Sequence, residues 1–99
     1  MRDVFKALAD PTRREILSQL SRGSMTAGEL WSLFPTSRAS LSHHFNVLKA
    51  ADLVRTERRG QTIVYSLNTS VVEEITSAVL DIFEPKARVS AARKAKVSR

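Results

Sequence analysis

Residues 26–51 read TAGELWSLFPTSRASLSHHFNVLKAA, and this stretch decides the fold. Thr26 followed three residues later by Glu29 is a capping box, which predicts that a helix begins here. Pro35 stops that helix, and the polar pair at 36–37 caps a second one that continues to the end of the stretch. Because only a few residues separate the two helices, the pattern predicts a helix-turn-helix.

Two short helices are expected before this stretch, at 2–9 and 11–20. The Asp-Pro pair between them favours a new helix, since aspartate is a good N-cap and proline is tolerated at the first helical position. After the stretch, residues 53–67 (LVRTERRGQTIVYSL) change to an alternating pattern, which predicts two strands around a turn at Gly60. A hairpin directly after a helix-turn-helix is a wing.

A last helix is expected from a second capping box at Ser70–Glu73 until Pro85. The predicted fold is therefore mainly α with a small β-hairpin, a winged helix-turn-helix that occupies residues 1–84. Within that range ten basic residues balance ten acidic ones, so the net charge of +6 comes entirely from residues 85–99. This tail is polar, basic and aperiodic, and we expect it to be disordered.

Composition excludes several classes of protein. The chain has no cysteine, so it carries no disulfide and no thiolate metal site. Its N-terminus has no apolar signal region and no run long enough for a membrane span, so we expect a cytoplasmic protein. The sequence has no nucleophile-base-acid set, no glycine-rich phosphate loop and no metal-ligand cluster, which argues against an enzyme. The sequence pI near 10.5 favours an anionic partner.

The predicted second helix of the helix-turn-helix has two different faces. Leu41, Phe45 and Leu48 fall together on a helical wheel and should face the core. The opposite side carries small hydrogen-bonding residues, which a helix needs for close approach to base edges in a major groove. Serines near the helix start suit phosphate contacts. The alternative is a plain polar surface. The expected DNA-contacting residues of this helix are Ser37, Arg38, Ala39, Ser40, Ser42, His43 and Asn46.

The two histidines of the chain, His43 and His44, are adjacent in this helix. Successive helical residues point about 100° apart, so the pair does not suit one metal ion, which needs spacings of three or four. His43 falls near the exposed side, where contact with DNA is the favoured interpretation over inert surface. His44 falls beside the core, where we expect a partly buried histidine with a nearby hydrogen bond.

Three segments together resemble the ArsR-type winged-helix repressors: FKALADPTRREIL (5–17), SRASLSHHFNVLKAADLV (37–54) and RRGQTIVYSLN (58–68). Within that family, the chain looks most like the SdpR-like branch of the sporulation-delaying-protein autorepressor. The resemblance implies a homodimeric repressor that binds double-stranded DNA at an inverted-repeat operator. It also implies that the wing tip, with Arg58, Arg59 and Gln61, meets phosphates or the minor groove.

In the family the first and last helices form the dimer interface. The matching apolar positions here are Val4, Phe5, Leu8, Val72, Ile75, Val79, Ile82 and Phe83. The family's metal sensors use a cysteine pair before the recognition helix, or aspartate and histidine on the last helix. Neither set is present, so the resemblance carries over no metal and no cofactor.

Two further matters stay open at the level of sequence. An effector or an antirepressor protein remains a further partner of unspecified kind. The alternative function is a protein-interaction module that uses the winged helix as a scaffold and docks another protein through the last helix and the tail.

Overall fold

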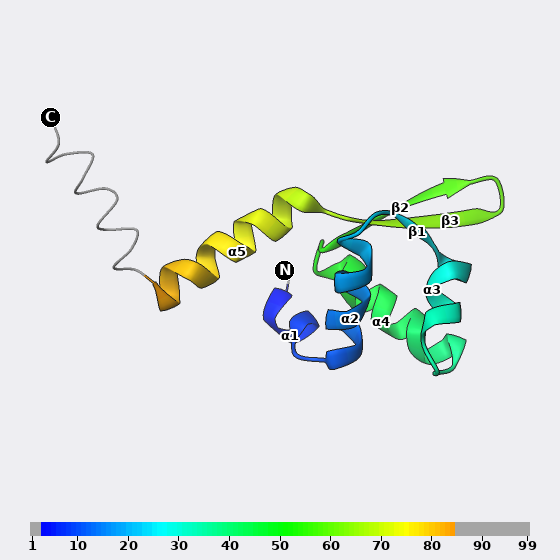
Figure 1. The fold of residues 1–99 in the computed structure, drawn as a ribbon, viewed down its shortest axis with the longest axis horizontal. Helices are drawn as coiled ribbons and strands as arrows, with labels where there is room; N and C mark the ends of the chain where they lie inside the picture. The colour runs from blue at the N-terminus through cyan, green and yellow to red at the C-terminus, as the bar shows by residue number, and fades with distance from the viewer. Residues whose placement is uncertain (1–2, 85–99) are drawn as a thin grey trace, which may run out of the picture.

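The computed structural model describes residues 3–84, which form a winged helix-turn-helix (Figure 1). The first four helices lie together below a small antiparallel sheet in this view, and the last helix extends away from them toward the opposite end from the wing. The elements are α1 (Val4–Leu8), α2 (Pro11–Leu20), β1 (Met25–Thr26), α3 (Ala27–Leu33), α4 (Arg38–Ala50), β2 (Val54–Arg59), β3 (Thr62–Leu67) and α5 (Thr69–Phe83). The predicted fold class is confirmed, and the predicted tail at 85–99 lies outside the described residues.

Side-chain caps fix where the first four helices begin. The Asp3, Asp10 and Ser37 side chains each accept a hydrogen bond from a backbone N–H three residues on. At α3 the predicted capping box is present in both directions: the Glu29 N–H donates to the Thr26 hydroxyl at 3.0 Å, and the Thr26 N–H donates to the Glu29 carboxylate at 2.8 Å. These bonds satisfy backbone donors that a helix start leaves without partners.

The sheet has three strands in the order β1-β3-β2, all antiparallel. The hairpin was predicted, and its register pairs Val54 with Leu67 and Arg59 with Thr62. Strand β1 was not predicted, because two residues are too short to show alternation. It pairs with Val64 and Tyr65 in the middle of β3 and thereby connects the start of α3 to the wing.

The core lies where α2, α3 and α4 meet the sheet. Its largest fully buried side chains are Ile16, Leu30, Leu41 and Leu48. The Phe45 ring, 2% exposed, lies 4.7 Å from the Tyr65 ring between centroids and joins α4 to β3. The predicted core face of α4 is therefore confirmed. Because this face is buried, the opposite face of α4 points to solvent.

Two large apolar side chains of the first and third helices, Phe5 and Leu33, are exposed rather than buried. In α1, the buried side chains are Val4 and Ala7, whereas Phe5 is 61% exposed. The helix begins at Val4, later than predicted, because Asp3 caps it. In α3, Leu33 is 49% exposed because the helix ends at this residue and the chain turns to an extended Phe34.

The predicted capping box of the last helix is also wrong. Helix α5 begins at Thr69, with Asn68 as an N-cap that makes no side-chain cap hydrogen bond. The Asn68 N–H donates to the Leu53 carbonyl at 2.9 Å, and the Asn68 carbonyl accepts from the Val72 N–H at 3.0 Å. The sheet and the helix thus meet at Asn68, so Ser70 already lies inside the helix.

Candidate nucleic-acid interface

Helix α4 offers its predicted polar face to solvent. Arg38, Ala39, Ser42, His43 and Asn46 are all exposed, and Ser37 is exposed at the cap. Ser40 is only partly exposed. The four residues between the end of α3 and the start of α4 form the short turn of the helix-turn-helix. One side of α4 is therefore packed in the core, and the opposite side exposes a row of small hydrogen-bonding groups.

The two histidines separate as predicted. His43 is exposed, and His44 is held against α2 with its side chain 13% exposed. The His44 Nδ1 lies 3.2 Å from the Arg13 Nη1 and 3.8 Å from an Asp10 carboxylate oxygen. When the imidazole is uncharged, its Nδ1 accepts this bond from the guanidinium, which only donates, and its ring proton lies on Nε2. The ring is thus engaged in packing and hydrogen bonding within the fold.

Arg13 is a structural residue beneath the candidate site that sequence reasoning missed. Its guanidinium is buried and donates to the Ala7 carbonyl at 2.7 Å and to the Lys6 carbonyl at 2.9 Å. It therefore caps the end of α1 while it also contacts His44 on α4. A signal was present, since Arg13 stands three residues before Ile16 on the apolar stripe of α2.

Asp10 completes this cluster at the start of α2. The Arg13 backbone N–H donates to the Asp10 carboxylate at 3.0 Å, and this bond lowers the pKa of Asp10 below its ordinary value of 3.8. Partial burial opposes the shift, while the charges of His44 and Arg13 add to it. The carboxylate is therefore ionised at neutral pH and holds the first turn of α2.

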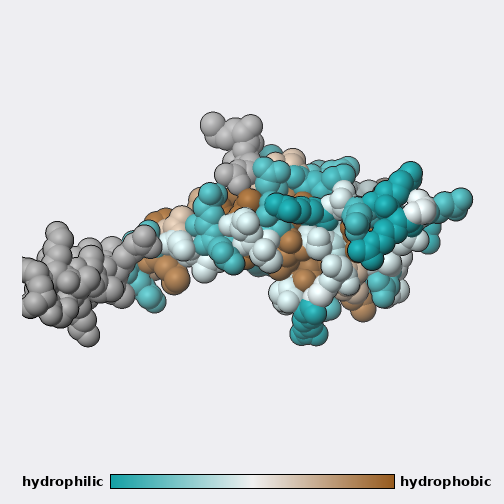
Figure 2. Space-filling model, turned by 90° about the horizontal axis from the view of Figure 1, so that it is seen from above, coloured by the Kyte–Doolittle hydropathy of each residue, from teal (hydrophilic) through white to brown (hydrophobic). Residues whose placement is uncertain are grey.

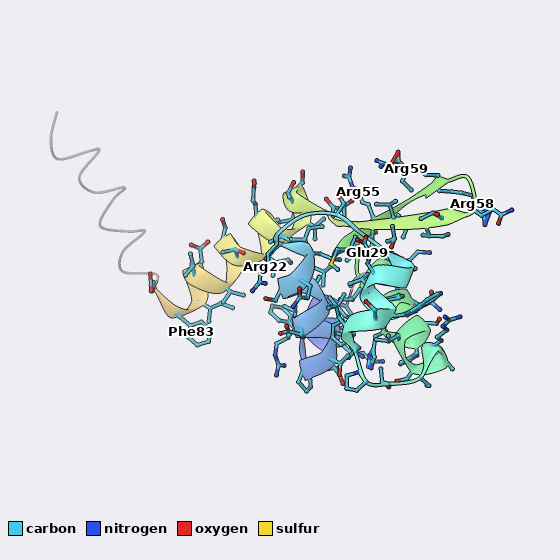
Figure 3. The ribbon with its side chains drawn as sticks, turned by 45° about the vertical axis from the view of Figure 1, so that its right-hand side comes forward. Arg22, Glu29, Arg55, Arg58, Arg59 and Phe83 are labelled. Carbon is cyan, nitrogen blue, oxygen red and sulfur yellow. The ribbon has the colours of Figure 1, made fainter. Side chains whose placement is uncertain are left out.

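The wing is a two-residue hairpin that turns at Gly60 and Gln61. Gly60 has φ +64°, a left-handed value that favours glycine, and a glycine at the first turn position matches a type II′ turn. Arg58 and Arg59 lie on opposite faces of β2, and Arg58 extends outward near the tip (Figure 3). Both arginines and Gln61 are exposed, as a DNA contact requires.

The two wing arginines differ in their partners. The Arg59 side chain contacts the Glu57 carboxylate, with both Nε and Nη2 at 2.8 Å from Oε1. Both side chains are more than 60% exposed, so the pair is weak and a phosphate could replace the carboxylate. Arg55 lies on the same face of β2 as Glu57 and Arg59, because alternate strand residues point the same way (Figure 3).

Arg38 at the start of α4 makes a contact that sequence reasoning did not anticipate. Its guanidinium carbon lies 4.5 Å from the centroid of the Trp31 ring, a cation–π distance between the two helices of the motif. Trp31 is partly buried and lines an open pocket of about 260 Å³ with the wing residues Gln61, Thr62 and Ile63.

A family model described as a helix-turn-helix domain matches residues 8–57. A solved structure of an ArsR-like transcriptional regulator from Rhodococcus sp. RHA1 has a TM-score of 0.73 and 34% identity, covering 93% of this chain and 87% of that one. The transcriptional repressor SdpR of Bacillus subtilis (strain 168) is 48% identical over 81 residues, 82% of this chain and 90% of that protein. The chain belongs to the ArsR family of transcriptional repressors.

The ArsR-family assignment is supported by a second named repressor. The arsenical resistance operon repressor of Staphylococcus xylosus is 39% identical over 72 residues, which cover 73% of this chain and 69% of that protein. The helix-turn-helix of this ArsR-family chain is formed by α3 and α4, and the resemblance predicted from its three segments is confirmed. These relatives are named as regulators of transcription, which makes DNA the partner that the family implies.

The ArsR-family chain also exposes an apolar surface far from the wing. Hydrophobic side chains appear along α5, whereas hydrophilic ones gather over the wing (Figure 2). Phe83 at the far end of α5 is 77% exposed and Ile82 is 64% exposed (Figure 3). Of the eight residues predicted for a dimer interface, Val4 offers almost no surface, because it is buried in the core of its own protomer.

The rest of the predicted interface divides into two groups. Leu8, Val72 and Ile75 are partly buried and pack against the protomer core, so they have only part of their surface left. Val79 is partly buried without belonging to that packing, and Phe5, Ile82 and Phe83 are exposed. Leu80, which was not predicted, is 48% exposed on the same helix.

Two further observations concern residues 3–84. In that range no group of three or more His, Cys, Asp or Glu side chains lies together as a metal ion would require. None of the helices in the same range combines the length and the apolar character needed to cross a membrane.

Proposed function

We propose that the chain is a homodimeric, sequence-specific repressor that inserts α4 into the major groove of DNA and places its wing on the adjoining backbone or minor groove. The observation that supports this most is the composition of the exposed face of α4. A merely solvated helix face usually carries more lysine and glutamate, whereas this one carries serine, histidine, asparagine and one arginine. Such side chains are short enough for close approach and bear donors for base edges.

The wing and the charge pattern support the same arrangement. The exposed Arg58, Arg59 and Gln61 lie at the end of the hairpin, where they would meet phosphates. The six bases of residues 85–99 would add attraction of the kind that phosphates give to any sequence. Repression would follow from occlusion of a promoter, the chain's own or that of a neighbouring operon, in the cytoplasm of the cell.

Dimerisation is proposed from the exposed apolar surface of α5 together with Phe5. A two-fold dimer would present two copies of α4, so its operator should be an inverted repeat with half-sites about one helical turn, ~34 Å, apart. We propose that binding does not depend on a metal, since the chain has no cysteine and its last helix has no histidine.

The test is selection of bound duplexes from a random pool by the full chain. We expect a single inverted-repeat consensus with fixed spacing, recovered equally in the presence of a chelator. A pool with no enrichment would contradict the proposal and would favour the alternative, a winged-helix protein-interaction module. Enrichment of single, unpaired half-sites would retain DNA recognition but contradict the two-fold dimer.

The selected duplex then allows a residue-level test of α4. Replacing Arg38 or His43 with alanine should cost about 1–3 kcal/mol on the selected duplex if the residue reads a base, with little loss on random DNA. Equal losses on both duplexes would instead assign that residue to a phosphate.

A further inference from the structure

The contact between Trp31 and Arg38 joins the two helices of the motif at the point where α4 begins. The 4.5 Å separation between the guanidinium carbon and the ring centroid is well inside the range of cation–π attraction, and tryptophan is the strongest aromatic partner for it. Within residues 3–84, no hydrogen bond or ion pair holds the Arg38 side chain in another way. The indole is therefore the group that orients this exposed arginine.

The position of the same indole relative to the wing is also informative. Trp31 borders the open pocket whose other lining residues include Gln61, Thr62 and Ile63 of the wing. The Trp31 side chain thus adjoins the wing and also contacts Arg38 of the recognition helix. The two elements expected to contact DNA meet at Trp31, although Trp31 itself is partly buried and belongs to neither of them.

The cation–π contact with Trp31 has a physical consequence for the freedom of the Arg38 side chain. A free arginine side chain loses much rotamer entropy when it is fixed on DNA. A guanidinium that already lies on a ring has lost part of this freedom. The guanidinium has five N–H donors, and the described contact with the ring is not a hydrogen bond, so these donors stay available for a base or a phosphate.

We propose that Trp31 is a positioning residue for DNA recognition: its ring holds Arg38 in the orientation in which the guanidinium meets DNA. This inference rests on the proposed DNA-binding function and extends it to a residue that does not itself touch DNA. If Trp31 only packs between α3 and the wing, its replacement should affect binding whether or not Arg38 is present.

A double-mutant cycle on the selected duplex separates these cases. We expect Trp31→Ala to weaken binding about three- to tenfold in the otherwise natural chain and to have little further effect when Arg38 is already alanine. Trp31→Phe, which keeps an aromatic face, should recover part of the loss. The matched control is an Arg58→Ala background, where Trp31→Ala should cost the same factor as in the natural chain.

The outcomes are distinct. An equal loss from Trp31→Ala with and without Arg38 would overturn the proposal and leave a packing role. A natural chain that binds no duplex better than random DNA would contradict the proposed function first, and the positioning role with it. Circular dichroism and thermal melting of each variant show whether it is folded.

A second measurement needs no change at Trp31, so it holds even if the Trp31 variants fail to fold. Trp31 is the only tryptophan in the chain, so the emission of the protein reports on the surroundings of this one indole. We expect Arg38→Ala to change the emission of the DNA-free protein, whereas Arg22→Ala, which removes another exposed arginine, should not. Identical emission from Arg38→Ala and the natural chain would show that the stack is not populated in solution and would overturn the proposal.

Discussion

Arg13 shows how one buried charge can hold three helices in place. It lies on α2, donates to two carbonyls at the end of α1, and contacts His44 on α4. A buried guanidinium is tolerated only when its donors find partners, and here the helix end supplies them. The orientation of the recognition helix relative to α1 therefore depends on this side chain.

Replacing Arg13 with methionine should keep most of the volume and remove the donors. We expect a loss of about 2–3 kcal/mol in the free energy of unfolding, because the Lys6 and Ala7 carbonyls lose their buried partner. Urea unfolding measures the loss. The control is Arg14→Met, which removes an exposed bond of 2.8 Å to the Leu8 carbonyl and should cost clearly less. Equal losses for the two variants would show that burial of Arg13 adds nothing.

The Asp10 carboxylate gives the fold a dependence on acid. Its pKa is lowered in the folded chain, first by the hydrogen bond from the Arg13 N–H, so its charged form is favoured by folding. The stability that it contributes is present above its ordinary value of 3.8 and is lost as the pH falls through the lower folded value. Asp10→Asn keeps a capping side chain but removes the titration.

We therefore expect the natural chain to exceed Asp10→Asn in stability at pH 7 and the difference to shrink below about pH 4. Urea unfolding at several pH values between 2 and 7 measures it. Asp10→Ala removes the cap as well and should lose about 1 kcal/mol at neutral pH. A difference between the natural chain and Asp10→Asn that does not vary with pH would mean that the carboxylate charge is irrelevant to folding.

At this scale the sequence separated His43 from His44 because helical geometry alone decides which side each faces. It did not reveal the partner of His44, because Arg13 lies 31 residues earlier and only tertiary packing brings them together. The stack of Arg38 on Trp31 was missed for a related reason. The path of the turn between α3 and α4 sets that contact, and the helical wheel of either helix alone does not contain it.

Elements with strong local signals were the easiest to predict. Helices α2, α3 and α4 each have a side-chain cap and an apolar stripe, and their bounds agree closely with the prediction. The start of α5 was misplaced because Ser70 and Glu73 have capping-box spacing. The backbone hydrogen bond from the Asn68 N–H to the Leu53 carbonyl instead decides where the helix begins. Strand β1 is defined by its pairing with β3, so its two residues show no local sequence pattern that predicts a strand.

The wing is the element whose two arginines can be compared most directly. Arg58 extends outward near the tip, whereas Arg59 is already engaged with Glu57 on its own strand. If Arg58 meets a phosphate, Arg58→Ala should weaken binding to selected and random duplexes alike. It should also reduce the slope of log affinity against log salt by about one.

Arg59→Ala is the matched control for this wing prediction. It should have a smaller effect, because a phosphate has to displace the Glu57 contact before Arg59 can bind it. Fluorescence anisotropy of labelled duplexes at several salt concentrations gives both slopes. A loss for Arg58→Ala on the selected duplex only would assign that residue to base reading and contradict the backbone contact.

For the whole molecule, the arrangement places the two proposed surfaces at opposite ends. The wing lies at one end and the exposed end of α5 at the other (Figure 1). The first half of α5 contacts the core through Val71, Val72 and Ile75, while Leu80, Ile82 and Phe83 near its end remain exposed. Large exposed apolar patches are common at association sites, and we propose that this stretch of α5 is the surface through which two chains associate. The sequence predicted the apolar stripe, but the extension of α5 away from the domain depends on the sheet-to-helix junction at Asn68.

The structure also indicates which substitution tests the dimer cleanly. Ile75→Asp would place a charge against the protomer core, so a loss of binding could reflect unfolding of the protomer. Val79 lies farther along α5, outside that packing, and Phe83 is largely exposed. A charge at either position should therefore have little effect on the stability of the folded protomer. We expect Val79→Asp and Phe83→Asp to convert a dimer into folded monomers, because an unpaired carboxylate would be buried in the interface.

Sedimentation equilibrium of each variant measures the change in mass, and circular dichroism shows that the protomer is still folded. Ser77→Asp is the matched control: it adds the same charge at an exposed polar position on α5 and should leave the dimer intact. Binding to the selected inverted repeat should fall steeply for Val79→Asp, because a monomer engages one half-site and loses the effective concentration of the second. A Val79→Asp protein that remains a dimer and binds the full operator normally would move the interface away from α5.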